Sequence, residues 1–209
     1  MRQHVNPLSH HFQEIVPIPP LNNIYKNHNN PLHLDIGCAS GDFLFRLANS
    51  NKDWNYLGIE IRERLVSRAQ SKLKDNLHNN LFFAFGNAEN LITDCIDKFP
   101  RDILESVSFN FPDPWFKKKH HKRRVLQPQL ITKISHIMPR GAYILIKSDV
   151  EDLFQYMDTI ILNSNLFKTY NYSIHDQEKC YNPNNLKTNR ESYVLSKEMI
   201  IYEQLYKKY

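Results

Sequence analysis

The densest group of chemically useful side chains lies between residues 110 and 124, in the stretch NFPDPWFKKKHHKRR. Asp113 stands between two prolines, which restrict the backbone and would hold its carboxylate in one place. Trp115 offers a flat face for stacking a nucleobase, and the lysines and arginines that follow it suit a run of phosphates. The combination predicts that a nucleic-acid base is brought to a carboxylate. The alternative is a proline-stiffened loop with a buried Trp115 and a solvated basic helix start.

The net charge of the chain comes from the same stretch. Lys and Arg number 27 against 22 Asp and Glu, which gives a net charge of +5. Six of these cations lie between Lys117 and Arg124, and without them 21 cations face 22 anions, a net charge of −1. A near-neutral chain with one dense cationic strip indicates a local contact with a polyanion. The stiffened-loop alternative leaves this concentration of charge unexplained.

A second group of residues has the spacing of a nucleoside-cofactor site. Gly37 and Gly41 bracket a turn after Asp35, and glycines there let the backbone approach a ligand. Glu60 follows about 20 residues later, where an acid can accept hydrogen bonds from a ribose diol. The acids beside the turn, Asp35 and Asp42, would repel the pyrophosphate of a dinucleotide. They suit S-adenosylmethionine, which carries a sulfonium, an ammonium and a ribose diol but no phosphate.

The hydrophobic pattern predicts the elements that would position these residues. Strands are expected at 32–36, 56–59, 81–85, 107–111 and 142–146, and helices at 42–49, 62–76, 126–138 and 150–162. Late strands at 167–173 and 200–206 would form an antiparallel hairpin at the sheet edge. A polar turn is expected at 86–90, where Asn87 either meets an adenine edge or is a simple turn residue. The alternation predicts an α/β fold, with a mostly parallel central sheet and helices on both faces.

Length and composition fit one intracellular domain. The chain has 209 residues, 41% of them hydrophobic, which is enough for a core without disulfide or metal staples. Residues 1–30 are predicted to be a partly ordered arm, followed by a domain at 31–209. We find no apolar run of about 18 residues and no secretory segment, so no membrane association is expected. Cys38, Cys95 and Cys180 lack C-x-x-C spacing, so we expect no disulfide, no metal site and a reducing compartment.

Several motifs make the sequence similar to a known family. FNFPDPWFKKKHHKRR, with LDIGCASG and GIE upstream and KSD and TNRES downstream, resembles the bacterial tRNA (guanine-N7)-methyltransferases over residues 31–209. The resemblance implies a Rossmann-like class I methyltransferase that uses S-adenosylmethionine to methylate N7 of guanine 46 in the tRNA variable loop. The N-terminal arm resembles that of cyanobacterial or plastid-encoded members, which implies the cytoplasm or the plastid stroma. The sequence leaves open a monomer or a homodimer, and which tRNA species are used.

The resemblance also implies a set of site residues. Asp113 matches the position proposed as catalytic. The cofactor-binding set, which includes the glycine of the turn, is Asp35, Gly37, Glu60, Asn87 and Asp113. The substrate-binding set is Lys117, Asp149, Thr188, Asn189, Arg190 and Glu191. The RNA-contacting stretch is Lys119, His120, His121, Lys122, Arg123 and Arg124. Three departures from the family pattern are Ala39 in place of Gly, Asn87 in place of Asp, and Arg190 where an aromatic residue is common.

The chemistry that follows needs little acid–base help. Guanine N7 carries an in-plane lone pair and can attack a sulfonium methyl without first losing a proton. Proximity can supply much of the rate. Asp113 would stabilise the positive charge that develops on the ring, with Asp149 orienting the base. The rival hypotheses are an NAD-dependent oxidoreductase, another S-adenosylmethionine-dependent methyltransferase, and an RNA-binding protein whose cofactor site has decayed at Ala39 and Asn87.

Overall fold

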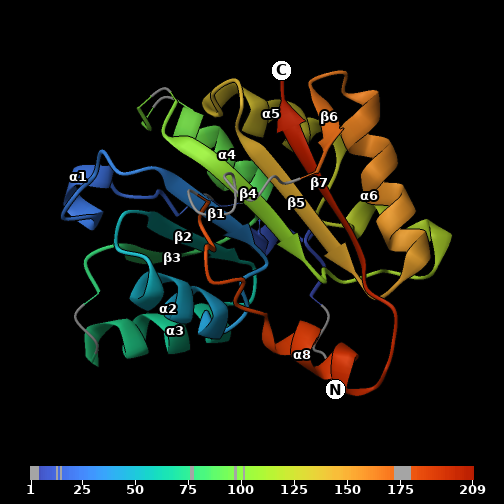
Figure 1. Ribbon diagram of the computed structural model, residues 1–209, viewed down its shortest axis with the longest axis horizontal. Helices are drawn as coiled ribbons and strands as arrows, with labels where there is room; N and C mark the ends of the chain where they lie inside the picture. Colours follow the sequence, from blue (N-terminus) through green and yellow to red (C-terminus); the bar gives the residue numbers. More distant parts are fainter. Residues whose placement is uncertain are drawn as a thin grey trace.

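The computed structural model describes residues 5–12, 14, 16–75, 78–96, 98–100, 102–171 and 180–209. A seven-stranded sheet forms its centre, in the order β3-β2-β1-β4-β5-β7-β6 (Figure 1). The parallel strands are β1 (Leu32–Ile36), β2 (Asn55–Glu60), β3 (Leu81–Phe85), β4 (Leu104–Asn110) and β5 (Tyr143–Ser148). β7 (Tyr202–Lys208) runs antiparallel to both of its neighbours, β5 and β6 (Phe167–Tyr170). The predicted α/β class and the late antiparallel hairpin are confirmed.

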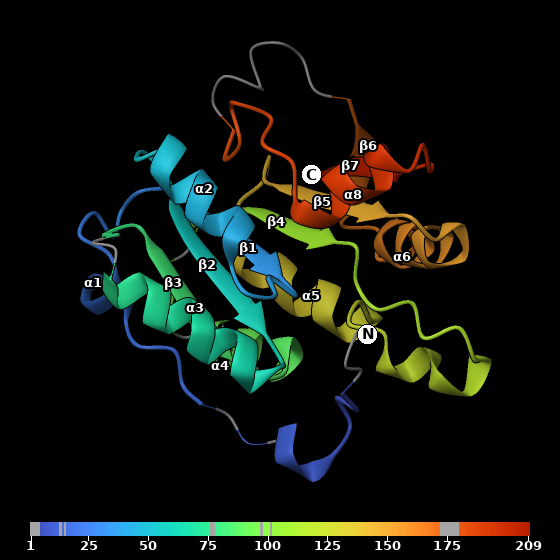
Figure 2. The same cartoon turned by 90° about the horizontal axis from the view of Figure 1, so that it is seen from below.

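Helices cover both faces of the sheet (Figures 1 and 2). One face packs against α4 (Ala88–Ile96), α5 (Pro128–Ile137) and α6 (Glu151–Asn163). The other face packs against α2 (Asp42–Ser50) and α3 (Glu63–Asp75). Among the helices in the described part of the chain, none is long and apolar enough to cross a bilayer.

The central strand β1 is buried on both faces, and its side chains alternate between two cores. Leu32, Leu34 and Ile36 belong to the apolar cluster beneath α4, α5 and α6. The intervening residues, His33 and Asp35, are also buried and face the α2 side, where His33 stacks on a tyrosine of the second cluster. Polar groups in the middle of a sheet require hydrogen-bond partners, and these partners shape the site described below.

Two helices differ from the sequence-based expectation. The polar turn predicted at 86–90 ends early, because α4 begins at Ala88; the Asn87 side chain accepts the Glu89 amide hydrogen at 2.9 Å and caps the helix start. The region after residue 180 contains α8 (Asn189–Ser196), which hydrophobic periodicity did not predict. Its start is fixed by a capping box, in which Thr188 and Glu191 each bond the other's backbone amide.

The N-terminal thirty residues contribute to the fold. They contain a short 3-10 helix, η1 (His10–Phe12), and α1 (Leu21–Ile24). Ile18, Leu21 and Tyr25 are buried in the first apolar cluster, and the Tyr25 hydroxyl donates to the Tyr56 carbonyl at 2.9 Å. The division between arm and domain at residue 31 stays a prediction, and this packing favours grouping residues 18–25 with the core.

Candidate active site

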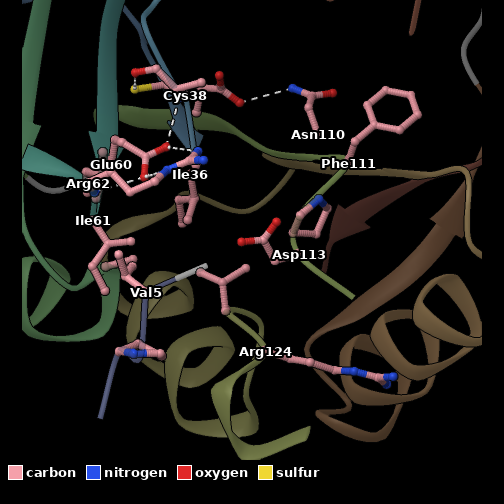
Figure 3. A pocket seen from close by; sticks show the side chains of 18 of the residues that line it. Val5, Ile36, Cys38, Glu60, Ile61, Arg62, Asn110, Phe111, Asp113 and Arg124 are labelled. Carbon is pink, nitrogen blue, oxygen red and sulfur yellow. Dashed lines mark hydrogen bonds and ion pairs between the residues drawn. The ribbon is translucent and has the colours of Figure 1, made fainter. Parts of the chain in front are cut away.

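A cavity of about 370 Å³ opens beyond the carboxyl ends of the central strands (Figure 3). All of the predicted cofactor-binding residues line it, namely Asp35, Gly37, Glu60, Asn87 and Asp113. Six residues from the predicted RNA and substrate sets also line it, namely Lys122, Arg123, Arg124, Thr188, Asn189 and Arg190. The other six predicted site residues lie outside this lining, namely Lys117, Lys119, His120, His121, Asp149 and Glu191. The fold therefore gathers most of the predicted site at one end of the sheet.

The turn between β1 and α2 presents bare backbone to the cavity. Gly37 has a left-handed φ of 85°, and a Cβ placed there would meet no described atom within 4 Å. Gly41 has a φ of 75°, and a Cβ there would lie 2.3 Å from the Phe83 ring. Ala39 holds a φ of 52° in the same turn, so the alanine keeps the path of the turn at a cost in backbone strain.

Asp35 is 3% exposed and is held by neutral donors. The Ser108 hydroxyl donates to Oδ1 at 2.6 Å, and the Asn110 amide donates to the same oxygen at 3.0 Å. Burial raises the pKa of this carboxyl to about 6; the two hydrogen bonds oppose the rise and the charge of Glu60 adds to it. At neutral pH the Asp35 carboxyl is therefore ionised, although its burial favours the neutral form.

Glu60, at the end of β2, is the most heavily bonded carboxylate of the site. Oε2 accepts from the Ala39 amide at 3.0 Å, and Oε1 accepts from the Arg62 amide at 3.0 Å. The Arg62 guanidinium donates to both oxygens at 2.9 Å. The pKa of Arg62 is raised first by its hydrogen bond to Glu60 and further by the charges of Glu60 and Asp113. The carboxylate predicted to meet a ribose diol is thus occupied by an arginine.

Asn87 lines the cavity and bonds both the start of α4 and the N-terminal segment. Besides capping α4, its side-chain amide donates to the Pro7 carbonyl at 3.4 Å. Pro7, Val5 and Leu8 line the cavity as well, so the N-terminal segment forms part of its wall. The Asn87 amide therefore lies at the cavity, as a contact with an adenine edge would require, and Asn87 also acts as a turn residue because it caps α4.

The loop that carries Asp113 is tied down at several points. The Phe111 amide donates to the Lys147 carbonyl at 2.8 Å, and the Arg124 Nε donates to the Pro114 carbonyl at 2.8 Å. Phe111 and Trp115 both hold positive φ angles, 50° and 47°. Figure 3 shows the Asp113 carboxylate pointing into the cavity, on the side where Arg62 and Glu60 lie.

The cationic strip after this loop forms a short 3-10 helix, η2 (Lys118–Arg123). Lys118, Lys119 and Lys122 are exposed. Arg124 is 3% exposed; it bonds Asp152 at 2.6 Å and packs over the Tyr156 ring. Figure 3 shows its side chain extending away from Asp113. These contacts show that Arg124 anchors the loop, and its role in contacting RNA stays a prediction.

Trp115 and its neighbour differ in accessibility. The Arg123 guanidinium lies 5.1 Å from the Trp115 ring centroid, and the His120 ring meets Trp115 edge-on at 5.7 Å. Trp115 is half-buried by these contacts, whereas Phe116 is 75% exposed. The aromatic face most open to a base beside the cations is therefore that of Phe116, a residue that the sequence analysis did not single out.

The predicted substrate motif near the C-terminus is held by ion pairs, of which the pair of Lys147 with Glu191 is buried. Lys147 Nζ lies 3.0 Å from Glu191 Oε1 and 3.0 Å from Glu203 Oε2. Arg190 forms an ion pair with Asp149. Glu191 is thus a helix cap and an ion-pair partner at once, and Asp149, predicted to orient the base, already holds an arginine.

Comparison with known proteins identifies the family. The sequence matches the family model described as "Putative methyltransferase" over residues 29–204. A tRNA (guanine-N(7)-)-methyltransferase of Prochlorococcus marinus subsp. pastoris is 55% identical over 208 residues, 100% of both chains. Another, from Prochlorococcus marinus strain MIT 9515, is 53% identical over 99% of both chains. The chain belongs to the tRNA (guanine-N7)-methyltransferase family.

The fold of this methyltransferase also has solved counterparts. The structure of an antibiotic-related methyltransferase superposes with a TM-score of 0.61 at 15% identity, covering 95% of this chain and 98% of that one. This likeness supports the class I methyltransferase fold and nothing finer. In the described part of the methyltransferase, no group of three or more His, Cys, Asp or Glu side chains is arranged to hold a metal ion.

Sequence reasoning missed two contributors to the methyltransferase site. Arg62 follows Glu60 by two positions in GIEIR, and a basic residue so close to a strand-end acid was the available signal. The N-terminal segment at 5–8 gave no comparable signal, because the bond from Asn87 to the Pro7 carbonyl joins residues 80 positions apart and uses a backbone acceptor.

Proposed function

We propose that this chain transfers the methyl group of S-adenosylmethionine to N7 of guanine 46 in the variable loop of tRNA. One observation carries the proposal. Asp113, held in a tethered loop, lines the same cavity as the glycine turn, and the exposed cations of η2 follow it directly. A methyl donor, a carboxylate and a phosphate-binding strip can therefore meet at one place.

The residues present fit the methyl donor. Open space at Gly37 allows close approach of a ligand to backbone, and the carboxylates of Asp35, Glu60 and Asp113 line the cavity. Arginines and a lysine line it as well, so the local placement of these three carboxylates, and not the net charge of the lining, is what suits a sulfonium and an ammonium. When bound, S-adenosylmethionine supplies an electrophilic methyl group. Asp35 and Glu60 would hold its polar groups, with Glu60 exchanging part of its bonding to Arg62 for ribose hydroxyls.

The protein's own contribution to the reaction is orientation and electrostatics. Guanine N7 needs no deprotonation, so the site needs no strong base. Asp113 stabilises the purine as it becomes positively charged. Asp149 orients the base once Arg190 releases it, and Lys118, Lys119 and Lys122 bind backbone phosphates.

A methyl-transfer assay on unmodified tRNA, followed by mapping of the modified nucleotide, tests the proposal. We expect 7-methylguanine at position 46, and no incorporation into a matched transcript with adenine at that position. Methylation that persists in the adenine transcript, or that maps to another nucleotide, would contradict the proposed position.

A further inference from the structure

A buried polar chain runs beneath the cavity, and the proposed chemistry does not use it. It lies on the adjacent parallel strands β1 and β4, whose register places His33 beside Ser106 and Asp35 beside Ser108. His33 and Ser108 are 0% exposed and Ser106 is 2% exposed. His33 Nδ1 lies 3.1 Å from Ser106 Oγ, and His33 Nε2 lies 3.2 Å from Ser108 Oγ.

The direction of each hydrogen bond in this chain is fixed by counting protons. A carboxylate only accepts and a hydroxyl has a single proton, so at neutral pH Ser108 gives its proton to Asp35. Ser108 must then accept from its other neighbours, the Asn110 amide at 3.1 Å and His33 Nε2. His33 therefore carries its proton on Nε2, and its bare Nδ1 accepts from Ser106.

The surroundings keep His33 neutral and in place. Its ring is stacked on Tyr181 at a centroid distance of 3.6 Å and an interplanar angle of 2°. The Tyr181 carbonyl in turn accepts from the Tyr56 hydroxyl at 2.7 Å. Burial lowers the pKa of His33 well below its usual value, so the ring donates one proton toward Ser108 without adding a charge.

We propose that His33 and Ser108 are positioning residues that keep Asp35 ionised and oriented for the cofactor. The inference rests on the proposed cofactor-binding role of Asp35. Ser108 and Asn110 both bond Oδ1 and neither uses Oδ2, which leaves that oxygen for the cavity that Asp35 lines. A chain of neutral donors stabilises the anion without a counter-charge that would repel a cationic ligand.

The charged groups around Asp35 make this support necessary. Glu60 on β2 raises the pKa of Asp35, and the Cys38 thiol in the turn has its own pKa raised by burial and by both carboxylates. Arg62 is the nearby cation, and it is bonded to Glu60 rather than to Asp35. His33 on the same strand is neutral. The hydrogen bonds from Ser108 and Asn110 are therefore what lowers the pKa of Asp35.

The test is the pH profile of S-adenosylmethionine affinity of the full chain, measured by calorimetry from pH 5.5 to 8.5. For Ser108→Ala we expect the pH below which affinity is lost to rise by about one unit, so binding is about threefold weaker near pH 6.5, about eightfold weaker at pH 5.5, and recovers toward pH 8.5. Taking the ratio of variant to wild type at each pH cancels the titration of the ligand. Ser135→Ala is the matched control, since it truncates a buried serine on α5 whose hydroxyl bonds the Thr132 carbonyl and takes no part in the polar chain.

A second pair of variants keeps the inference testable if Ser108→Ala folds poorly. His33→Leu removes the donor and should shift the profile in the same direction, whereas His33→Gln keeps an amide donor and should restore it. A loss of affinity by the same factor at every pH would overturn the positioning role and leave the proposed function intact. A wild-type chain that binds S-adenosylmethionine but modifies another nucleotide would overturn only the proposed function. A wild-type chain that does not bind it would overturn both.

Discussion

At the scale of single residues, the three acids of the predicted cofactor-binding set are held in place by three different means. Asp35 is supported by neutral donors, Glu60 is paired with Arg62, and Asp113 sits in a loop tethered by Phe111 and Arg124. Asp113 is the acid that the loop places beside the cationic strip. It is therefore the one suited to a base delivered by RNA, and its removal should affect chemistry more than binding.

Asp113→Asn tests this division of roles. The amide keeps the shape but loses the charge that stabilises the methylated purine, so we expect turnover to fall about 100-fold while the tRNA dissociation constant changes by less than about threefold. Single-turnover kinetics and a filter-binding titration measure the two quantities. Asp53→Asn, the same change at an exposed residue outside the cavity, is the control. Equal losses in turnover and binding would refute the assignment.

The strain at Ala39 gives a stability prediction. An L-residue with a φ of 52° is disfavoured by roughly 1–2 kcal/mol relative to glycine. Replacing Ala39 by glycine would relieve this strain, but glycine also gives the unfolded chain more conformational entropy, which offsets part of the stabilisation. Ala39→Gly should therefore stabilise the chain by up to about 1 kcal/mol in urea denaturation. Asn185→Gly is the control, because Asn185 has a similar φ of 48° but asparagine tolerates it better. A destabilised Ala39→Gly chain would show that the turn is not strained.

At the scale of elements, α8 is attached to β5 through Lys147. This lysine is buried against Glu191, so Lys147→Met would leave a carboxylate in the interior without a counter-charge. We expect a loss of about 3 kcal/mol in the free energy of unfolding. The control is Lys133→Met, which breaks the more exposed pair with Glu89 and should cost less than about 1 kcal/mol. Similar losses in both variants would mean that α8 does not depend on the buried pair.

The exposed lysines of η2 are expected to bind backbone phosphates of tRNA together. Replacing Lys118, Lys119 and Lys122 by alanine should lower the slope of log affinity for tRNA against log salt by about 2, since each phosphate contact contributes about 0.7–0.9. The triple variant Lys26, Lys74 and Lys168 to alanine removes the same charge from exposed positions elsewhere. A slope that falls equally in both would show that only net charge matters.

At the scale of the whole molecule, the sequence predicted the strands, helices and turns that depend on short stretches of neighbouring residues. Alternation and periodicity located β1, β3, α2 and α6 to within a residue or two, and the turn after β1 marked the cavity. The start of α8 was missed because its capping box is a polar signal in a segment of weak amphipathicity. The bond from Ser108 to Asp35 joins residues far apart in the chain, and the adjacency of β1 and β4 brings them together. The ion pair of Arg190 with Asp149 depends on where α8 packs beside the end of β5, which local sequence does not specify.

Asp35 links the stability of the whole chain to its proposed function. Its pKa is raised from 3.8 to about 6 by folding, so the folded chain binds this proton more tightly than the unfolded chain. The stability from that proton is present below about pH 4 and is lost as the pH rises through about 6. At pH 7.5 the ionised Asp35 therefore destabilises the free chain by an amount on the order of 2–3 kcal/mol.

Asp35→Asn should therefore be more stable than the wild type at pH 7.5, by about 2 kcal/mol, with a gain that shrinks toward pH 4.5. The neutral side chain still offers an oxygen to Ser108 and Asn110, but it loses the charge proposed to hold the cofactor, so S-adenosylmethionine should bind more weakly. Urea denaturation at the two pH values measures the first effect and calorimetry the second, with Asp53→Asn as the exposed control. A variant that is less stable at pH 7.5 would show that the buried anion contributes to folding. A variant that is more stable but binds S-adenosylmethionine poorly would show that the Asp35 carboxylate serves cofactor binding at a cost in the stability of the fold.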